Sequence, residues 1–204
     1  MKLIVATNNS HKLDEIRSML DDSISVLSLN DIGLDADIEE NGATLEENSH
    51  IKAAFVARYL KRTGYEHPYT VIADDTGLMV EALNGEPGVH TARYAGENGE
   101  SDSEANMRLL LKNLEGNENR RACFCTVITM IEEQVPYLTK IKYFAGKVEG
   151  TILTEKHGSE GFGYDPIFMP DGYDKSFAEL GPEIKNRISH RAMAVKELVE
   201  YLSK

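Results

Sequence analysis

The chain of 204 residues has no tryptophan, only two cysteines and only six prolines. Two cysteines are too few for the disulfide framework of a small secreted domain, and a chain of this length buries a hydrophobic core without cross-links. No apolar run approaches the roughly 18 residues of a membrane-spanning helix, and the first residues lack the apolar stretch of a secretory signal. We therefore expect a cytoplasmic protein without a membrane segment.

Positive charge is also scarce. The 22 Lys and Arg residues are outnumbered by 34 Asp and Glu residues, and the formal net charge is −12. Because binding to duplex DNA or RNA needs a basic surface, nucleic acid is excluded as the main partner. A small anionic ligand remains compatible with this charge, since a few cations gathered at one place override the global sign locally.

The two cysteines, Cys123 and Cys125, lie two residues apart in an apolar, β-branched run. Side chains alternate along a strand, so both thiols fall on one face of it, where they are poorly placed to form a disulfide. A metal site would need further Cys or His ligands. We interpret the pair as two small, reduced strand residues.

Strand and helix patterns alternate along the chain, which favours an α/β fold. The expected strands are 2–6, 25–29, 71–73, 147–153 and 164–168, and residues 122–131 and 137–144 form a hairpin. Four helices are expected: a first that contains Leu13, a second capped by Thr44, a third capped by Ser101 and a last at 189–202. The opening βα units suggest parallel neighbours and the hairpin is antiparallel, so the sheet is mixed. We expect one domain over residues 1–204, with two lobes and an active-site cleft between them.

A polar turn follows the first predicted strand. Its residues are Thr7, Asn8, Asn9, Ser10, His11 and Lys12. The backbone N–H groups and the dipole at a helix start favour an anion, and the hydroxyl, amide and Lys groups add donors. The turn lacks the glycines of a Walker A loop or a Rossmann fingerprint, so an ordinary N-cap turn is the alternative.

Two adjacent carboxylates, Asp74 and Asp75, end the third predicted strand, directly before Thr76. Ligands gather at such strand ends in α/β sheets. Adjacent carboxylates repel each other unless a cation or donors offset their charge, and oxygen ligands suit Mg²⁺. Glu39 and Glu40 form a second acidic pair that could supply another ligand. The alternatives are a solvated Asx-type turn and a solvated acidic loop.

Aromatic residues alternate with glycines at Gly161, Phe162, Gly163 and Tyr164, and Asp165 follows. One ring can stack on a flat heterocycle, and the carboxylate can accept its ring N–H groups. The glycines let the backbone approach a ligand closely. The alternative is a Gly-rich turn whose aromatic residues belong to the core.

Cations gather near the C-terminal end of the sequence, at Lys185, His190 and Arg191. Ser189 is a good N-cap for the last helix, which would place His190 and Arg191 in its first turn. Cations there oppose the helix dipole, so an anionic partner would explain them. Exposed surface charge is the alternative, and simple solvation is the alternative for the lone Lys52 of the second predicted helix.

Together and in this order, the motifs resemble the inosine triphosphate pyrophosphatase family over essentially the whole chain. The matching segments are Thr7-x-Asn9-x-x-Lys12-x-x-Glu15, Glu40-x-Gly42-x-Thr44-x-x-Glu47-Asn48-x-x-x-Lys52-Ala53, Ala73-Asp74-Asp75-Thr76-Gly77-Leu78, Pro87-Gly88-Val89, Ala92-Arg93-Tyr94-Ala95-Gly96, Gly161-Phe162-Gly163-Tyr164-Asp165-Pro166 and Ser189-His190-Arg191. The resemblance implies magnesium-dependent hydrolysis of ITP, dITP and XTP to the monophosphate and pyrophosphate. It also implies a long mixed central sheet, two lobes and, usually, a homodimer.

The resemblance further implies roles for residues in the phosphate region. The family's phosphate loop falls on Thr7 to Lys12, and its magnesium ligands fall on Glu40 and Asp75. Asp75 is also the implied general base, which would manage the proton of a water attacking the α-phosphorus. Lys12 and Lys52 would neutralise the charge on the pyrophosphate leaving group.

The remaining roles concern the nucleoside. Thr76 matches a substrate contact, Phe162 to Asp165 match the base-binding segment, and Lys185, His190 and Arg191 match further substrate contacts. Tyr164 stands where some relatives have Trp. Donors among the three cations would pair with O6 of a 6-oxo purine and leave the amino group of adenine unpaired. A pyrophosphatase for modified pyrimidine triphosphates and a non-catalytic nucleotide-binding protein are the alternatives.

Overall fold

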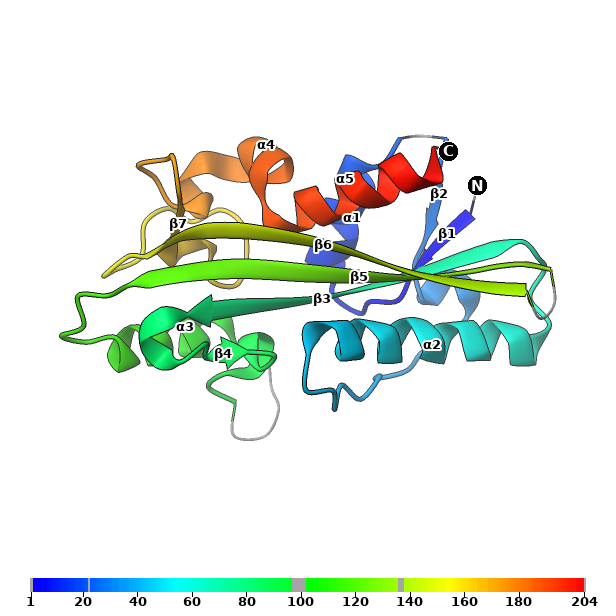
Figure 1. The fold of residues 1–204 in the computed structure, drawn as a ribbon, viewed down its shortest axis with the longest axis horizontal. Helices are drawn as coiled ribbons and strands as arrows, with labels where there is room; N and C mark the ends of the chain where they lie inside the picture. The colour runs from blue at the N-terminus through cyan, green and yellow to red at the C-terminus, as the bar shows by residue number, and fades with distance from the viewer. Residues whose placement is uncertain (1, 22, 97–101, 136–137, 204) are drawn as a thin grey trace. The chain divides into compact units, whose positions relative to one another are not determined.

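The computed structural model describes residues 2–21, 23–96, 102–135 and 138–203, and its strands form one seven-stranded sheet (Figure 1). The sheet order is β2-β1-β3-β5-β6-β7, and β4 pairs with β3. The elements are β1 (Lys2–Val5), α1 (Ser10–Met19), β2 (Ser25–Leu27), α2 (Leu45–Thr63), β3 (Tyr69–Val80), β4 (Pro87–Gly88), α3 (Ser103–Asn113), β5 (Arg121–Val135), β6 (Leu138–Ile152), β7 (Phe168–Pro170), α4 (Phe177–Ile188) and α5 (His190–Leu202).

The sheet is mixed, as predicted. β1 pairs in parallel with β2 and with β3, in registers that place Leu3 beside Val26 and beside Thr70. β3 pairs antiparallel with β4, and β6 pairs antiparallel with β7. The parallel pairs are those whose strands are linked by the helices α1 and α2, since parallel strands need a long crossover connection. None of the described helices is long and apolar enough to cross a membrane.

Several predicted boundaries were wrong. The third strand does not end at Asp74 but continues as β3 to Val80, because its side chains are covered on both faces. The strands predicted at 137–144 and 147–153 are the single strand β6. Of the strand predicted at 164–168 only Phe168 is extended, because Asp165–Ile167 form a 3-10 turn and β7 runs from Phe168 to Pro170. The helix α4, which bends at Gly181 with φ +76° before Pro182, was not predicted. Ser101 lies outside the described residues, and Asp102 caps α3.

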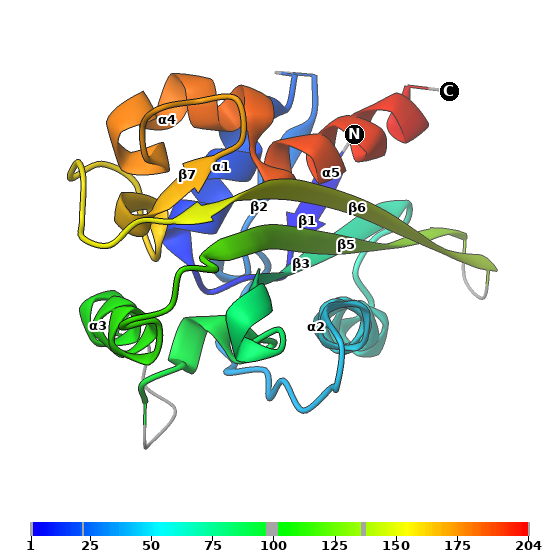
Figure 2. The same ribbon diagram turned by 60° about the vertical axis from the view of Figure 1, so that its left-hand side comes forward.

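The chain forms two compact units. Unit 1 comprises Met1–Asp75, Val127–Ala145 and Ala194–Lys204. Its sheet has α2 on one face and α1 and α5 on the other (Figures 1 and 2). Alternate residues of β1 serve the two faces: Ile4 packs in the cluster that contains Val56 of α2, whereas Leu3 packs with Ile16 of α1 and Leu198 of α5. The central strand β1 is therefore buried on both sides, as is usual for parallel strands with helical crossovers.

Unit 2 comprises Thr76–Thr126 and Gly146–Met193. Its core lies between α3 and α4, with Leu110 of α3 and Phe177 of α4 in one cluster with strand residues of the sheet. Aromatic rings fill its centre, where Phe168 lies 4.8 Å from Phe124 and 5.4 Å from Phe177, measured between ring centroids. The polar residues described below are set into this apolar core.

Candidate functional site

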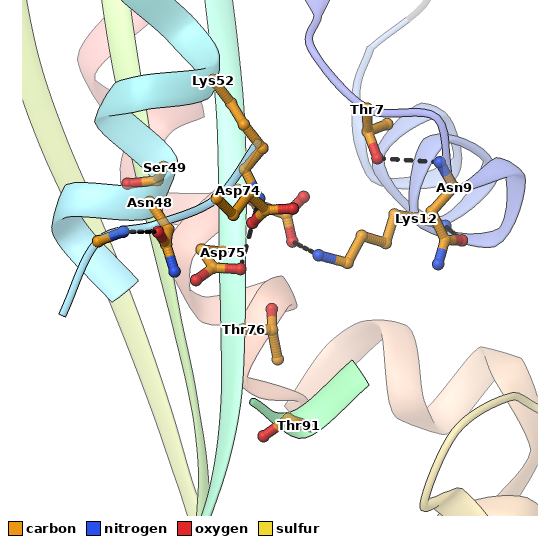
Figure 3. Close-up of polar contacts among 12 residues, drawn as sticks. Thr7, Asn9, Lys12, Asn48, Ser49, Lys52, Asp74, Asp75, Thr76 and Thr91 are labelled. Carbon is orange, nitrogen blue, oxygen red and sulfur yellow. Dashed lines mark hydrogen bonds and ion pairs between the residues drawn. The ribbon is translucent and has the colours of Figure 1, made fainter. Parts of the chain in front are cut away.

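The polar turn after β1 forms the start of α1. The Thr7 hydroxyl accepts a hydrogen bond from the backbone N–H of Asn9 at 3.1 Å, and the Asn9 side chain accepts one from the backbone N–H of Lys12 at 3.1 Å (Figure 3). Asn9 is thus the N-cap of the helix. Asn8 donates instead to the carbonyl oxygen of Ala36 at 2.9 Å. Ser10 and His11 open the first turn of α1 as exposed residues.

Successive residues of β3 point to opposite faces of the sheet, and the two carboxylates are separated in this way. Asp74 meets α1, where Lys12 Nζ lies 3.1 Å from its Oδ2. Asp75 meets α2, where Lys52 Nζ lies 3.4 Å from its Oδ1 (Figure 3). A strand with two adjacent acids can therefore stay buried, because each acid has a lysine on its own side.

Lys52 also contacts Glu40, at 2.6 Å between Nζ and Oε2. Burial disfavours charge on Lys52, but attraction to Asp75, Asp74 and Glu40 outweighs burial and raises the pKa of its ammonium group. Solvation is therefore the wrong interpretation of Lys52, which is only 8 % exposed. Its charge is held in place by the surrounding carboxylates.

Burial raises the pKa of Asp75 above the ordinary value for a carboxyl group, although Lys52 and Lys12 favour its ionised form. Its Oδ2 atom is buried and accepts no hydrogen bond from any described residue. A buried carboxylate oxygen left in this state is costly in free energy. Asp75 therefore has one oxygen held by a lysine and a second that is suited to a cation or to a water proton.

The loop that carries Glu40 is anchored to the first turns of α2. The backbone N–H of Gly42 donates to Asn48 Oδ1 at 2.8 Å, and that of Ala43 donates to Glu47 Oε2 at 2.7 Å. A Cβ atom at residue 42 would lie 2.7 Å from both Asn48 Oδ1 and Glu47 Cβ, so only glycine allows this close approach. The anchoring fixes Glu40 where Lys52 can reach it.

Two polar residues that the sequence patterns did not single out hold α2 against the sheet. Ser49 of α2 and Thr129 of β5, each fully buried, share a hydrogen bond of 2.7 Å between their hydroxyls. This contact lies three residues before Lys52 on the helix, on its sheet-facing side. The sequence signal was weak, because Asn48 and Lys52 are further polar residues among the buried residues of this helix.

The residues of this cluster fit a magnesium ion. Glu40 and Asp75 converge on the same Lys52 ammonium group, so both carboxylates are near one point. Mg²⁺ is held by one or two carboxylates, with water and substrate phosphates completing its shell. Within the described ranges no group of three or more His, Cys, Asp or Glu side chains is placed to hold a metal.

In unit 2, Asp165 organises the aromatic segment. Its Oδ2 accepts hydrogen bonds from the backbone N–H of Phe162 at 2.8 Å and from Lys185 Nζ at 2.7 Å. A Cβ atom at Gly161, where φ is +81°, would overlap this carboxylate. Both charges of the Asp165–Lys185 pair are buried, and the pair fixes the turn that presents Phe162.

The ring of Phe162 is flanked by cations. Lys185 Nζ lies 4.4 Å and Arg191 Cζ lies 5.8 Å from its centroid. Tyr164, by contrast, is buried in the core, where its hydroxyl donates to the carbonyl oxygen of Thr91 at 2.9 Å. Burial raises the pKa of Tyr164. Phe162 is therefore the half-buried aromatic face of this segment, and Gly163 follows it with φ +64°.

The Ser-His-Arg segment begins α5 as predicted, with Ser189 Oγ accepting from the backbone N–H of Ala192 at 3.2 Å. His190 and Arg191 are 4 % and 1 % exposed, so surface charge is the wrong interpretation of them. Arg191 Nη2 donates to Thr76 Oγ1 at 3.2 Å. Thr76 therefore lies with the cations of unit 2, one residue beyond Asp75.

The two cysteines are free, and their sulfur atoms lie 4.0 Å apart on one face of β5. Burial, with Cys123 nearby, raises the pKa of the Cys125 thiol to about 12. The free state of both thiols agrees with the interpretation of the pair as reduced strand residues.

The sequence and the fold match known proteins along their full length. The Ham1 family model matches residues 3–201. A dITP/XTP pyrophosphatase of Flavobacterium johnsoniae is 49% identical over 100% of this chain and 98% of its own, and one of Porphyromonas gingivalis is 50% identical over 98% and 97%. The solved structure of the Staphylococcus aureus Ham1 protein has a TM-score of 0.82 and 41% identity, covering 100% of this chain and 98% of its own. These matches confirm the resemblance found in the sequence, and the chain belongs to the Ham1 family.

Proposed function

We propose that the protein hydrolyses the non-standard purine nucleoside triphosphates ITP, dITP and XTP to the monophosphate and pyrophosphate, and so cleanses the nucleotide pool of the cytoplasm. The observation that carries this proposal is the buried Asp75, which has a raised pKa, a lysine on one oxygen and no hydrogen-bond partner among the described residues on the other. Relatives that are about half identical to this chain bear the name dITP/XTP pyrophosphatase.

Unit 1 supplies the groups that suit a triphosphate. The start of α1 offers backbone N–H groups and a positive helix end, and Lys12 and Lys52 add two cations. In the substrate complex these lysines would exchange part of their contact with carboxylates for phosphate oxygens. We assign Glu40 and Asp75 as the residues that hold Mg²⁺, which supplies charge neutralisation on the phosphates when bound.

The reaction needs a base for the attacking water. A water oxygen forms the new bond to the α-phosphorus, the bond from that phosphorus to the oxygen bridging to the β-phosphate breaks, and pyrophosphate leaves. Asp75 Oδ2 accepts the proton that the water loses. A carboxylate whose pKa burial has raised is a better base than an exposed one.

Unit 2 supplies the groups that suit a 6-oxo purine. The half-buried ring of Phe162 can stack on the base. Lys185 and Arg191 are donors beside it, His190 precedes Arg191 in the chain, and O6 of hypoxanthine or xanthine accepts hydrogen bonds. Adenine has an amino group at the same place, which would leave buried donors unpaired.

A substrate panel tests the proposed function. With Mg²⁺ present, we expect kcat/KM for ITP, dITP and XTP to exceed that for ATP by about 10²-fold or more, because the buried donors lose their acceptor in adenine. The product released should be pyrophosphate. A preference for modified pyrimidine triphosphates would assign the chain to that other activity. Tight binding of ITP without turnover would make it a non-catalytic nucleotide-binding protein.

The variant Asp75→Asn tests the base. We expect kcat for ITP to fall by about 10²–10⁴-fold. The control is Asp14→Asn on the exposed face of α1, where the side chain is 73 % exposed, and it should leave kcat unchanged.

The same variant should not lose stability. Because burial raises the pKa of Asp75, its ionised form destabilises the fold at neutral pH, so the melting temperature of Asp75→Asn at pH 7 should equal or exceed that of the wild type. A variant that is folded and turns over at the wild-type rate would remove Asp75 from the mechanism.

We also propose that the protein is a homodimer, joined through the arm formed by the end of β5 and the start of β6. In β6 the residues from Leu138 to Tyr143 are all exposed, on both faces of the strand. Among them Leu138, Ile141 and Tyr143 are large and apolar, and Val135 at the end of β5 is 53 % exposed. A second copy of the chain covering this arm would explain apolar residues on an exposed strand.

Sedimentation or light scattering tests this arrangement. Ile141→Lys should convert a dimer into a monomer at micromolar concentration, because it buries a charge in the contact. Tyr173→Lys, which changes a similarly exposed large residue of unit 2 (39 % against 44 % for Ile141), should leave the dimer intact. A wild type that is monomeric, or an Ile141→Lys variant that stays dimeric, would contradict this interface.

A further inference from the structure

Asn48 of α2 is a buried residue whose side chain is held by the chain at one end only. The residue is 3 % exposed. Its Oδ1 atom accepts a hydrogen bond from the backbone N–H of Gly42 at 2.8 Å. Because a backbone N–H only donates, the atom that faces Gly42 is the carbonyl oxygen, and the amide nitrogen lies at the other end. That Nδ2 atom carries two N–H groups and donates to no described residue.

A second buried asparagine shows how the fold satisfies such a side chain at both ends. Asn106 of α3 is also 3 % exposed. Its Oδ1 accepts from the backbone N–H of Ala95 at 2.7 Å, and its Nδ2 donates to the carbonyl oxygen of Ala92 at 2.9 Å. Buried N–H groups that lack an acceptor are costly in free energy. The amide of Asn48 therefore indicates an acceptor that the described chain does not supply.

The Asn48 amide lies with the groups assigned to the triphosphate. Asn48 and Lys52 are four residues apart in α2 and both are buried, so they share one face of the helix. On that face Lys52 contacts Asp75 of β3 and also Glu40. In Figure 3 the amide nitrogen of Asn48 is turned away from the bond that its Oδ1 atom makes, on the side of Asp75.

The surrounding charges indicate which acceptor fits. Glu40 and Asp75 already place two carboxylates around Lys52, so an aspartate at residue 48 would add a third. Asparagine has the same shape but presents N–H donors, which suit an anionic oxygen that enters from outside the chain. Among the groups of the proposed substrate, the phosphate chain supplies such oxygens.

We propose that Asn48 is a further substrate-binding residue, whose Nδ2 atom donates to a phosphate oxygen of the nucleoside triphosphate. The inference rests on the proposed function. One side chain would then do two things, because its Oδ1 atom holds the loop that carries Glu40 and its Nδ2 atom holds the phosphate chain. The loop and the substrate would thereby be placed relative to each other by a single rigid amide.

The variant Asn48→Asp separates the two ends of the side chain. It keeps an oxygen that can accept from Gly42, and it replaces the N–H donors by an oxygen that repels phosphate. We expect kcat/KM for ITP to fall by about 10–10²-fold, the effect of losing one hydrogen bond to a charged group. The control Asn41→Asp adds the same charge at an exposed residue next to Glu40. It should stay within about 3-fold of the wild type, because exposed charges are screened.

Two results of this comparison would overturn the proposal. A wild-type kcat/KM in Asn48→Asp would show that the residue acts only through Gly42. An equal fall in Asn48→Asp and Asn41→Asp would assign the effect to the added charge and not to the lost donor.

The side-chain N–H signals of Asn48 in a ¹H–¹⁵N spectrum give a readout that needs no turnover. The probe is inorganic tripolyphosphate with Mg²⁺, which carries phosphate oxygens and no base. The Asn48 signals of the wild type should shift on titration, whereas those of Asn106, which the chain satisfies at both ends, should not. Asn48 signals that do not move at any tripolyphosphate concentration would overturn the inference, even if Asn48→Asp fails to fold. The proposed function fails separately, if the wild type turns over neither ITP nor XTP.

Discussion

The alternation of side chains along β3 is the constraint on which the rest of the site depends. Because consecutive residues point to opposite faces, Asp74 faces α1 and Asp75 faces α2, and each acid meets one lysine there. The two charges are thereby kept apart and compensated inside a strand that is covered on both sides. The geometry also leaves Asp75 incompletely satisfied, since one oxygen is held by Lys52 and the other accepts no hydrogen bond from the described chain. A carboxylate in that state lowers the stability of the fold, but it can accept a proton or bind a cation.

In unit 2, too, each buried charge has a polar partner. Its buried charges are also paired, with Asp165 holding Lys185 and the threonine hydroxyls holding Arg191 and His190. These pairs leave Lys185 and Arg191 beside the half-buried ring of Phe162. The incompletely satisfied carboxylate therefore lies in unit 1, and the cations beside an aromatic ring lie in unit 2. In a protein with a formal net charge of −12, burying a few cations in fixed places reconciles an acidic chain with an anionic substrate.

The sequence predicted much of the fold and most of the candidate site residues, and its errors have physical causes. Periodicity located the opening βα units, and the N-cap at Ser189 was correct because capping is local chemistry. The end of the third strand was misplaced at Asp74 because adjacent acids normally mark a loop, and only the lysines of two separate helices make a buried continuation possible. The helix α4 was missed because Gly181 and Pro182 interrupt its pattern. Thr126, whose hydroxyl lies 2.7 Å from Thr76 Oγ1 and 2.6 Å from His190 Nδ1, carried no signal, since a threonine in a strand is ordinary until its partners are known.

Hydrolysis of ITP in H₂¹⁸O tests the role of Asp75 most directly, because the label records which phosphorus the water attacks. If the base at Asp75 directs water to the α-phosphorus, one ¹⁸O atom appears in the monophosphate and none in the pyrophosphate. Label in the pyrophosphate instead would mean attack at the β-phosphorus and would contradict a mechanism in which Asp75 activates water against the α-phosphorus.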